Sequence, residues 1–148
     1  MQIIGFNFTK ILAEKSPDFE RSGLNTNIEF TNVIEEKVPI LKDSESIKVS
    51  FKYSLIYSTQ DEKKKEKEEK KGEVTFEGNI VLAVNKEEAK SLQKDWKKRK
   101  LPESIKIPLF NLILRKCSIK AAQLQEDVSL PIHLPIPKIA PAQNQKKE

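Results

Sequence analysis

Residues 46–58, which read SIKVSFKYSLIYS, alternate between apolar and polar side chains over almost their whole length. The apolar or aromatic positions are Ile47, Val49, Phe51, Tyr53, Leu55 and Tyr57, and only Ile56 interrupts the polar positions between them. Because successive side chains of a β-strand point to opposite faces, this pattern predicts a long strand with one buried and one solvated face. A solvated face is typical of an antiparallel sheet, since parallel sheets are usually covered on both sides.

Three further stretches show the same period of two and predict the other strands of this sheet. They are residues 3–15, 24–35 and 73–84, and the last is expected to form a hairpin with residues 46–58. The apolar positions that share a parity are Ile4, Phe6, Phe8 and Leu12 in the first, Leu24, Ile28, Phe30 and Ile34 in the second, and Val74, Phe76, Ile80, Leu82 and Val84 in the third. The charged hairpin loop 60–72 cannot bury enough surface to offset the entropy of ordering it. We interpret it as a mobile connection or as frayed strand extensions.

The first helix is predicted to begin after Asn85, a favoured N-cap residue that is followed three positions later by Glu88, as in a capping box. Ala89, Leu92 and Trp96 lie on one helical stripe, so we interpret all three as core residues. Basic residues up to position 100 suit the negative end of the helix dipole, and the proline at position 102 stops the helix.

The second helix is predicted over residues 108–125 or slightly longer, with Pro108 in its first turn. Its apolar residues are spread over more than one face: Leu109, Phe110, Leu112, Ile113, Leu114, Cys117 and Ala121. A helix of this kind is buried between layers or meets another subunit.

The segment from Val128 to Ile136 alternates apolar residues with polar residues and prolines, which excludes a helix and a central strand. We therefore expect an extended, proline-rich ribbon that packs against its own subunit, with part of it at an interface. Together with the preceding helix, it supplies the residues predicted to line an apolar groove or a subunit interface: Leu109, Phe110, Ile113, Leu130, Ile132, Leu134 and Ile136. Residues 1–140 then form one domain, and residues 141–148 form a flexible tail.

The formal net charge of +5 is concentrated in residues 86–100, where seven basic residues accompany three acidic ones. Clustered lysine and arginine side chains can displace counterions from nucleic acid, so this helix end is a candidate site for RNA or another anionic partner. The candidate residues are Lys94, Lys97, Lys98, Arg99 and Lys100. A solvated helix end is the alternative interpretation, and the choice between the two stays open.

Composition argues against catalysis and against metal or cofactor binding. His133 is the only histidine and Cys117 the only cysteine, which gives little support to a metal site or to an activated nucleophile. We expect His133 to be a surface residue and Cys117 to behave as a small buried hydrophobe. We see no signal peptide and no apolar run of about 20 residues, so a soluble cytoplasmic protein is expected. The abundance of lysine and glutamate is typical of hyperthermophile proteins.

The order of these elements resembles the SecB-type export chaperones and their archaeal relatives. The residues that carry the resemblance are Gly72-Glu73-Val74 at the fourth strand, Ile107-Pro108-Leu109 at the long helix, and Leu130-Pro131-Ile132-His133-Leu134-Pro135 after it. The resemblance implies an α+β fold, namely a four-stranded antiparallel sheet with two C-terminal helices on one face and an extended proline-rich ribbon. It also implies subunits that pair through sheet edges and stack through the long helix. The bacterial members are strongly acidic, whereas this chain is basic.

Two functions of different classes are predicted, and a purely structural subunit of a complex is a third possibility. The first is a non-enzymatic, SecB-like oligomer that holds unfolded or nascent polypeptide in apolar grooves. The alternative is a basic homodimeric factor that binds ribosomal particles or rRNA and regulates subunit association or dormancy. The expected partners are therefore a second copy of the chain, as a homodimer or tetramer, and either polypeptide or a ribosomal particle. Neither membrane insertion nor a small-molecule substrate is expected.

Overall fold

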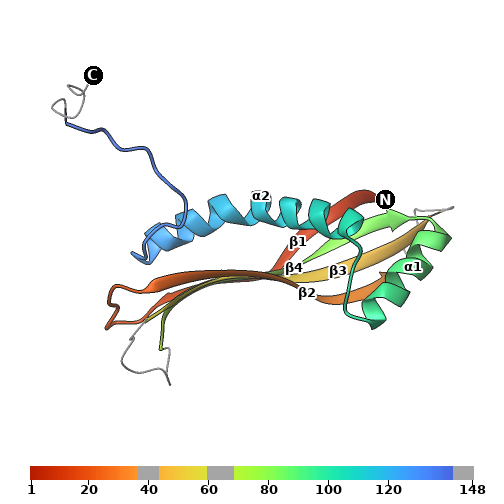
Figure 1. Cartoon of the computed structure of the whole chain (residues 1–148), viewed down its shortest axis with the longest axis horizontal. Helices are drawn as coiled ribbons and strands as arrows, with labels where there is room; N and C mark the ends of the chain where they lie inside the picture. The colour runs from red at the N-terminus through yellow and green to blue at the C-terminus, as the bar shows by residue number, and fades with distance from the viewer. Residues whose placement is uncertain (37–43, 60–68, 142–148) are drawn as a thin grey trace.

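The computed structural model describes residues 1–36, 44–59 and 69–141, which form a four-stranded antiparallel sheet and two helices (Figure 1). The elements are β1 (Gln2–Lys15), β2 (Gly23–Glu36), β3 (Glu45–Ser58), β4 (Lys70–Val84), α1 (Lys86–Lys97) and α2 (Glu103–Asp127). The strand order is β1-β4-β3-β2, so β3 and β4 are central and β1 and β2 are the edges. The predicted α+β fold class and the β3–β4 hairpin are confirmed. Most of the loop 60–72 and of the tail 141–148 lies outside the described residues.

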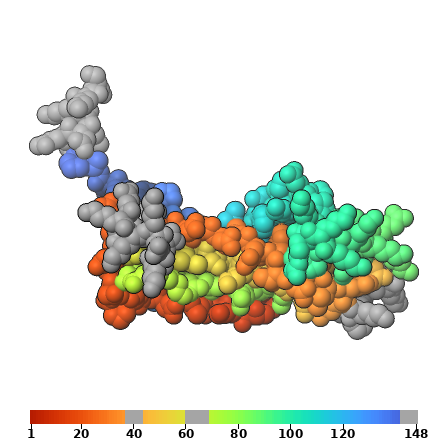
Figure 2. Space-filling view, turned by 60° about the horizontal axis from the view of Figure 1, so that its bottom comes forward, coloured from red at the N-terminus to blue at the C-terminus, as the bar shows by residue number. Residues whose placement is uncertain are grey.

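The covered face of the sheet is built around β3, whose six predicted inward residues, from Ile47 to Tyr57, are each at most 1% exposed. The opposite face carries polar side chains such as Ser50, whose hydroxyl donates a hydrogen bond of 2.8 Å to Asn79 Oδ1 on β4. In the described part of the chain no helix crosses this polar face, and Figure 2 shows the strands side by side on it. The predicted division into one buried and one solvated face is confirmed.

The predicted parity of β1 is wrong at its two ends. The register with β4 shifts between Ile3 and Gly5 and again between Phe8 and Lys10. Each shift inserts an extra residue, which reverses the alternation of side chains beyond it. Phe6 and Phe8 lie on the covered face, as predicted. Beyond the shifts, Ile3 and Ile11 lie on that face instead of the predicted Ile4 and Leu12.

β2 contains one such shift, between Phe30 and Asn32. Beyond it, Val33 lies opposite Val49 on the covered face and is 3% exposed. Ile34 lies opposite Lys48 on the polar face and is 38% exposed. Val33, rather than the predicted Ile34, is therefore the core residue at this end of β2.

α1 has the predicted capping box. The backbone N–H of Glu88 donates to Asn85 Oδ1 over 2.7 Å, and the Glu88 carboxylate accepts from the Asn85 N–H over 3.4 Å. Ala89 and Leu92 are buried, as predicted, whereas Trp96 is only partly buried. α1 packs against β2 and β3 near the end of the covered face.

α2 begins five residues earlier than predicted, at Glu103, so the prediction that Pro108 lies in its first turn is wrong. Pro102 is the N-cap, and its carbonyl accepts hydrogen bonds from the N–H groups of Ile105 and Lys106 at 3.0 and 2.9 Å. Pro108 lacks an N–H, so the carbonyl four residues before it receives no helical bond. That carbonyl belongs to Ser104, an exposed residue in the first turn, where water can replace the missing donor.

The buried stripe of α2 repeats every four residues: Leu109, Ile113, Cys117, Ala121 and Gln125. Because the helix has 3.6 residues per turn, a four-residue spacing drifts around its surface. The helix can thereby follow the twist of the sheet. Cys117 is fully buried, and burial raises the pKa of its thiol to about 12, as predicted for a small hydrophobe. Within the described ranges, neither helix is both long and apolar enough to cross a membrane.

Candidate functional site

A single helix cannot cover the full width of this sheet. The outer strands of a four-stranded sheet lie roughly 14 Å apart, since neighbouring strands are about 4.8 Å apart. A helix with its side chains is about 10 Å wide. Phe6 and Phe8 on β1 and Ile28 and Phe30 on β2 are accordingly only partly buried against the core. The flanks of α2 are thus the places where apolar side chains stay accessible.

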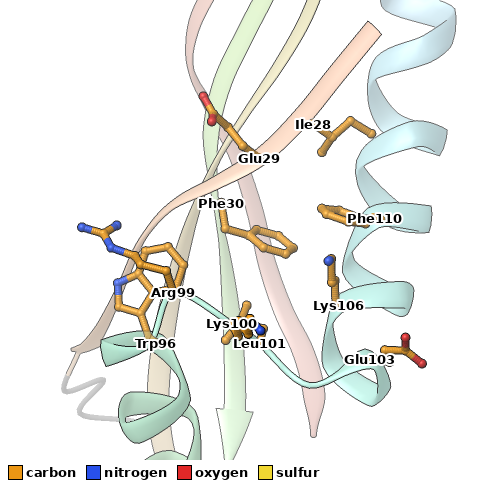
Figure 3. A pocket seen from close by; sticks show the side chains of 10 residues that line it. All are labelled: Ile28, Glu29, Phe30, Trp96, Arg99, Lys100, Leu101, Glu103, Lys106 and Phe110. Carbon is orange, nitrogen blue, oxygen red and sulfur yellow. The ribbon is translucent and has the colours of Figure 1, made fainter.

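On the β2 flank the accessible side chains border a pocket of about 480 Å³ (Figure 3). It lies between the β2 edge, the end of α1, the connection to α2 and the beginning of α2. Its lining residues are Ile28, Glu29, Phe30, Trp96, Arg99, Lys100, Leu101, Glu103, Lys106 and Phe110. Ile28 and Phe30 point toward α2, whereas Glu29 between them points the opposite way, as strand alternation requires.

Aromatic rings form the walls of this pocket. The rings of Phe30 and Phe110 stack with centroids 4.8 Å apart and an angle of 12° between their planes. This stack joins the edge strand β2 to α2. Trp96, on the last turn of α1, forms a further wall. The surface is suited to aromatic or aliphatic side chains, because flat rings bury a large area.

Arg99 reaches the pocket through the backbone turn that ends α1. The N–H of Arg99 bonds the carbonyl of Trp96, and the N–H of Lys100 bonds the carbonyl of Asp95, at 2.8 and 3.1 Å. This is the Schellman arrangement, in which the residue after the C-cap is left-handed and usually glycine. Arg99 holds that position with φ of 57°, and its guanidinium lies 4.8 Å from the centroid of Trp96.

The rim of the pocket is positively charged. Arg99, Lys100 and Lys106 are exposed, and Lys106 Nζ lies 5.6 Å from the centroid of the Phe110 ring. None of these three cations forms an ion pair with another residue in the described ranges. Glu29 and Glu103 add two carboxylates to the lining, and that of Glu29 is directed away from Phe30 and Phe110. The site therefore combines an apolar interior with a cationic rim.

The predicted anionic-partner cluster is divided by the fold. Lys94 and Lys97 line a separate depression of about 630 Å³ beside α1, together with Lys86, Lys90 and the carboxylates of Glu35 and Glu45. Arg99 and Lys100 line the aromatic pocket. Lys98 is exposed and lines neither. These candidate residues therefore lie on two surfaces, because the chain turns after Lys98. Their contact with an anionic partner stays a prediction.

The predicted apolar groove is divided as well, and only Phe110 lines the pocket. Leu109 and Ile113 are core residues with no exposed surface. The ribbon splits into a packed half and an exposed half: Leu130 is 4% exposed, Ile132 is partly buried, and Leu134 and Ile136 are 37% and 60% exposed. Figure 1 shows the chain leaving the body of the protein after this packed half.

The packed half of the ribbon is held by a polar network at the end of α2. Gln125, which has no exposed surface, donates from Nε2 to Tyr57 Oη over 2.5 Å. The Tyr57 hydroxyl in turn donates to the carbonyl of Pro131. Gln125 Oε1 accepts from the backbone N–H of His133 over 3.2 Å and lies 2.7 Å from its Nδ1.

His133 is therefore not the surface residue that was predicted. An amide oxygen only accepts, so the short contact to Gln125 places the imidazole proton on Nδ1. Nε2 is buried and has no hydrogen-bond partner in the described part of the chain. Burial lowers the pKa of His133, because the charged imidazolium would lose its hydration there.

Sequence reasoning missed the contributions of Phe30 and Trp96, which it assigned to the core. Their strand and helix parities were read correctly, but parity does not reveal whether another element covers a side chain. The one local signal was the end of α1, where no glycine is available for the left-handed position that commonly closes a helix.

No family model and no curated protein matches the chain. Among solved structures, it is similar to the SecB-like chaperone Rv1957 of Mycobacterium tuberculosis, solved in complex with a ChAD peptide from the antitoxin Rv1956 HigA1. The sequences are 13% identical, the match covers 95% of this chain and 91% of that chain, and the TM-score is 0.46.

Proposed function

We propose that the protein is a non-enzymatic holdase that binds extended segments of unfolded or nascent polypeptide. The observation that carries this proposal is the position of the pocket beside an edge strand. Among the described residues, β2 is paired only with β3, so the other side of its backbone has no strand partner. An extended polypeptide can add to such an edge through main-chain hydrogen bonds, which do not depend on its sequence.

The side chains of a strand added beside β2 would alternate between the two faces of the sheet. Every second side chain would then point toward Phe30, Trp96 and Phe110, where burial of apolar area is favourable. Backbone pairing would supply general affinity, and the pocket would favour apolar and aromatic side chains. This combination suits a protein that holds many unfolded sequences.

Aggregation of a denatured client at rising protein concentration tests the proposal. The intact protein should suppress aggregation near stoichiometric ratios, and the double variant Trp96→Ala/Phe110→Ala should lose most of this effect. Phe8→Ala removes a partly buried ring from the opposite edge strand and serves as the matched control. Failure of the intact protein to change client aggregation would contradict the proposal, provided that its circular dichroism spectrum shows it to be folded.

Assembly into a homodimer or tetramer is part of the same proposal. The outer surface of α2 exposes Ile107, Leu114 and Ile119 at 53%, 40% and 65%, and β1 exposes Ile4 and Ile11 at 43% and 49%. Exposed apolar side chains in such numbers support a contact with another copy. Light scattering after size-exclusion chromatography should give a mass above that of the 17.0 kDa chain, and Leu114→Glu/Ile119→Glu should reduce it.

The ribosome-associated factor remains a second candidate because four lysines, Lys86, Lys90, Lys94 and Lys97, line one depression beside α1. Their spacing would allow several phosphate contacts, and binding should weaken steeply with salt. Co-sedimentation with ribosomal particles that is lost when Lys90, Lys94 and Lys97 are changed to Glu would favour it. Sedimentation independent of these changes would count against it.

A further inference from the structure

We propose that the β2-flank pocket selects polypeptide segments in which an apolar or aromatic residue and an acidic residue lie two positions apart. This inference rests on the proposed function and names the class of segment that the same site would take. It depends on the cations around the pocket and on the alternation of side chains in an added strand.

The first observation is that cations lie over the aromatic rings of the site. Arg99 covers Trp96 at 4.8 Å, and Lys106 lies over Phe110 at 5.6 Å. On the other flank of α2, Lys116 and Lys120 lie 6.0 and 5.8 Å from the rings of Phe6 and Phe8. A side chain that enters beside such a ring therefore meets a positive charge, which favours carboxylates and disfavours lysine or arginine.

The second observation is the backbone at Arg99. The left-handed conformation favours glycine, and an arginine there holds a strained backbone. That turn places its guanidinium over Trp96, on the rim of the pocket. Lys100 follows immediately and is also exposed. The positive rim is therefore built by the turn itself.

The third observation is the alternation of β2, which determines the spacing. Ile28 and Phe30 point into the pocket, whereas Glu29 points to the opposite face (Figure 3). An added strand alternates in the same way, so residues two positions apart share the pocket side. One can fill the apolar interior while the other reaches a rim cation. The residue between them faces the side of Glu29, where an acidic group would be repelled.

A polypeptide fits these observations better than a single-stranded nucleic acid. The unpaired backbone of β2 offers N–H and C=O groups in the spacing of a strand, which a polypeptide can match. A sugar–phosphate chain has no N–H groups to return to the β2 carbonyls. Glu29 and Glu103 would also repel a continuous row of phosphates along this edge.

Fluorescence anisotropy with labelled nine-residue peptides tests the inference. The first peptide places Phe and Glu two positions apart in a serine background, and the second replaces each Glu by Lys. The third keeps the composition of the first but places Glu next to Phe. The first should bind at least about fivefold more tightly than the second, since each exposed ion pair contributes modestly. It should also bind more tightly than the third, and both differences should shrink at high salt.

Two variants assign the selectivity to the rim. Arg99→Gly removes a charge from a position where glycine is favoured, and Lys106→Gln removes a second charge from an exposed helix position. Together they should bring the affinities of the first and second peptides to within about twofold of each other. Lys10→Gln is the matched control, because Lys10 lies opposite Glu77 on the far edge of the sheet. It should leave the preference unchanged.

The outcomes separate the two proposals. If all three peptides bind equally, the protein is a polypeptide binder without this selectivity, and the inference is wrong. If none binds and client aggregation is also unaffected, the proposed function is wrong as well. If a single-stranded RNA of nine nucleotides displaces the first peptide and loses affinity on Trp96→Ala, the pocket is a nucleic-acid site, and the inference is overturned.

Discussion

Both helices of this protein end in the same backbone turn, but the residue that follows the turn is buried at the end of α2 and exposed at the end of α1. At the end of α2, Ser129 is left-handed with φ of 60°, and the N–H of Leu130 bonds the carbonyl of Gln125. At the end of α1, Arg99 and Lys100 repeat the arrangement, with Asp95 as the acceptor. Leu130 is 4% exposed, whereas Lys100 is exposed.

The side chain after the left-handed residue decides whether the flank of the sheet is closed or open. Leu130 packs against Gly72 and lies near Tyr57, and the polar network of Gln125 holds the following residues in place. Lys100 cannot enter the apolar interior, so the pocket beside Trp96 stays open with charges at its rim. The same turn is therefore followed by a sealed core at the end of α2 and by an open pocket at the end of α1.

The largest expected change in the free energy of unfolding comes from truncating a leucine at the closed end of α2, compared with a leucine that lines the pocket. Leu130→Ala should lower the free energy of unfolding by about 2–4 kcal/mol, because it leaves a cavity in a closed core. Leu101→Ala removes the same atoms from the partly buried lining of the pocket and should cost less than about 1.5 kcal/mol. Urea denaturation measures both. Equal costs would show that the two ends are packed alike, contrary to this comparison.

A smaller effect is expected from a methyl group at the closed end. A Cβ at Gly72 would lie 2.7 Å from Leu130 Cδ2, closer than packed atoms approach, and 3.3 Å from Tyr57 Cδ2, which is a tight contact. Gly72→Ala should therefore cost about 1–3 kcal/mol through overpacking. The control is Gly5→Ala on β1, where the added Cβ would meet Val81 at an ordinary 3.4 Å. Thermal denaturation of the two variants should show a clear loss only for Gly72→Ala.

Replacing either left-handed residue by glycine should stabilise the fold, unlike the two changes above. Ser129→Gly should stabilise the fold by about 1 kcal/mol, because it removes the steric cost of a side chain in this conformation. Arg99→Gly should stabilise it less, by about 0.5 kcal/mol, since it also loses the contact with Trp96. Lys98→Gly, at a right-handed φ of −90°, is the control and should destabilise. A loss of stability at both left-handed positions would contradict the strain assigned to these turns.

The smallest expected effect is a pH dependence of the free energy of unfolding, which arises from His133 in the packed half of the ribbon. Burial lowers the pKa of His133 below its ordinary 6.5, so the unfolded chain binds a proton more readily than the folded one. The stability associated with neutral His133 is complete above about pH 6.5 and is lost as the pH falls through the folded pKa. Denaturation midpoints at pH 7.5 and 5.5 should differ less for His133→Gln than for the intact protein.

Asp18 should also make the stability depend on pH, but in a lower pH range than His133. Its hydrogen bond from Lys71, assisted by one from Ser16, lowers its pKa from 3.8 to about 2. The contribution of Asp18 is therefore present above pH 3.8 and is lost toward pH 2, below the range that tests His133. A change between pH 7.5 and 5.5 that persists in His133→Gln would have to come from another group.

Much of the fold could be predicted because its signals are local. The alternation of residues 46–58 identified the central strand, and the spacing of Asn85 and Glu88 identified the start of α1. The start of α2 was placed too late, because Pro108 was interpreted as a first-turn proline, whereas the structure has Pro102 as the N-cap. In the sequence Pro102 was assigned only to the end of the first helix, whereas in the structure its carbonyl accepts the first hydrogen bonds of α2.

The sequence by itself determined which residues alternate, where the helices are capped and which stretch is central, since each depends on neighbours a few positions away. Only the tertiary structure decided the register shifts at Phe8 and Phe30, the closure over Gly72 and the pocket beside Trp96. The register shifts depend on strand pairing, and the pocket depends on how much of a four-stranded sheet one helix can cover. That is a matter of relative widths in space, which no periodicity along the chain records.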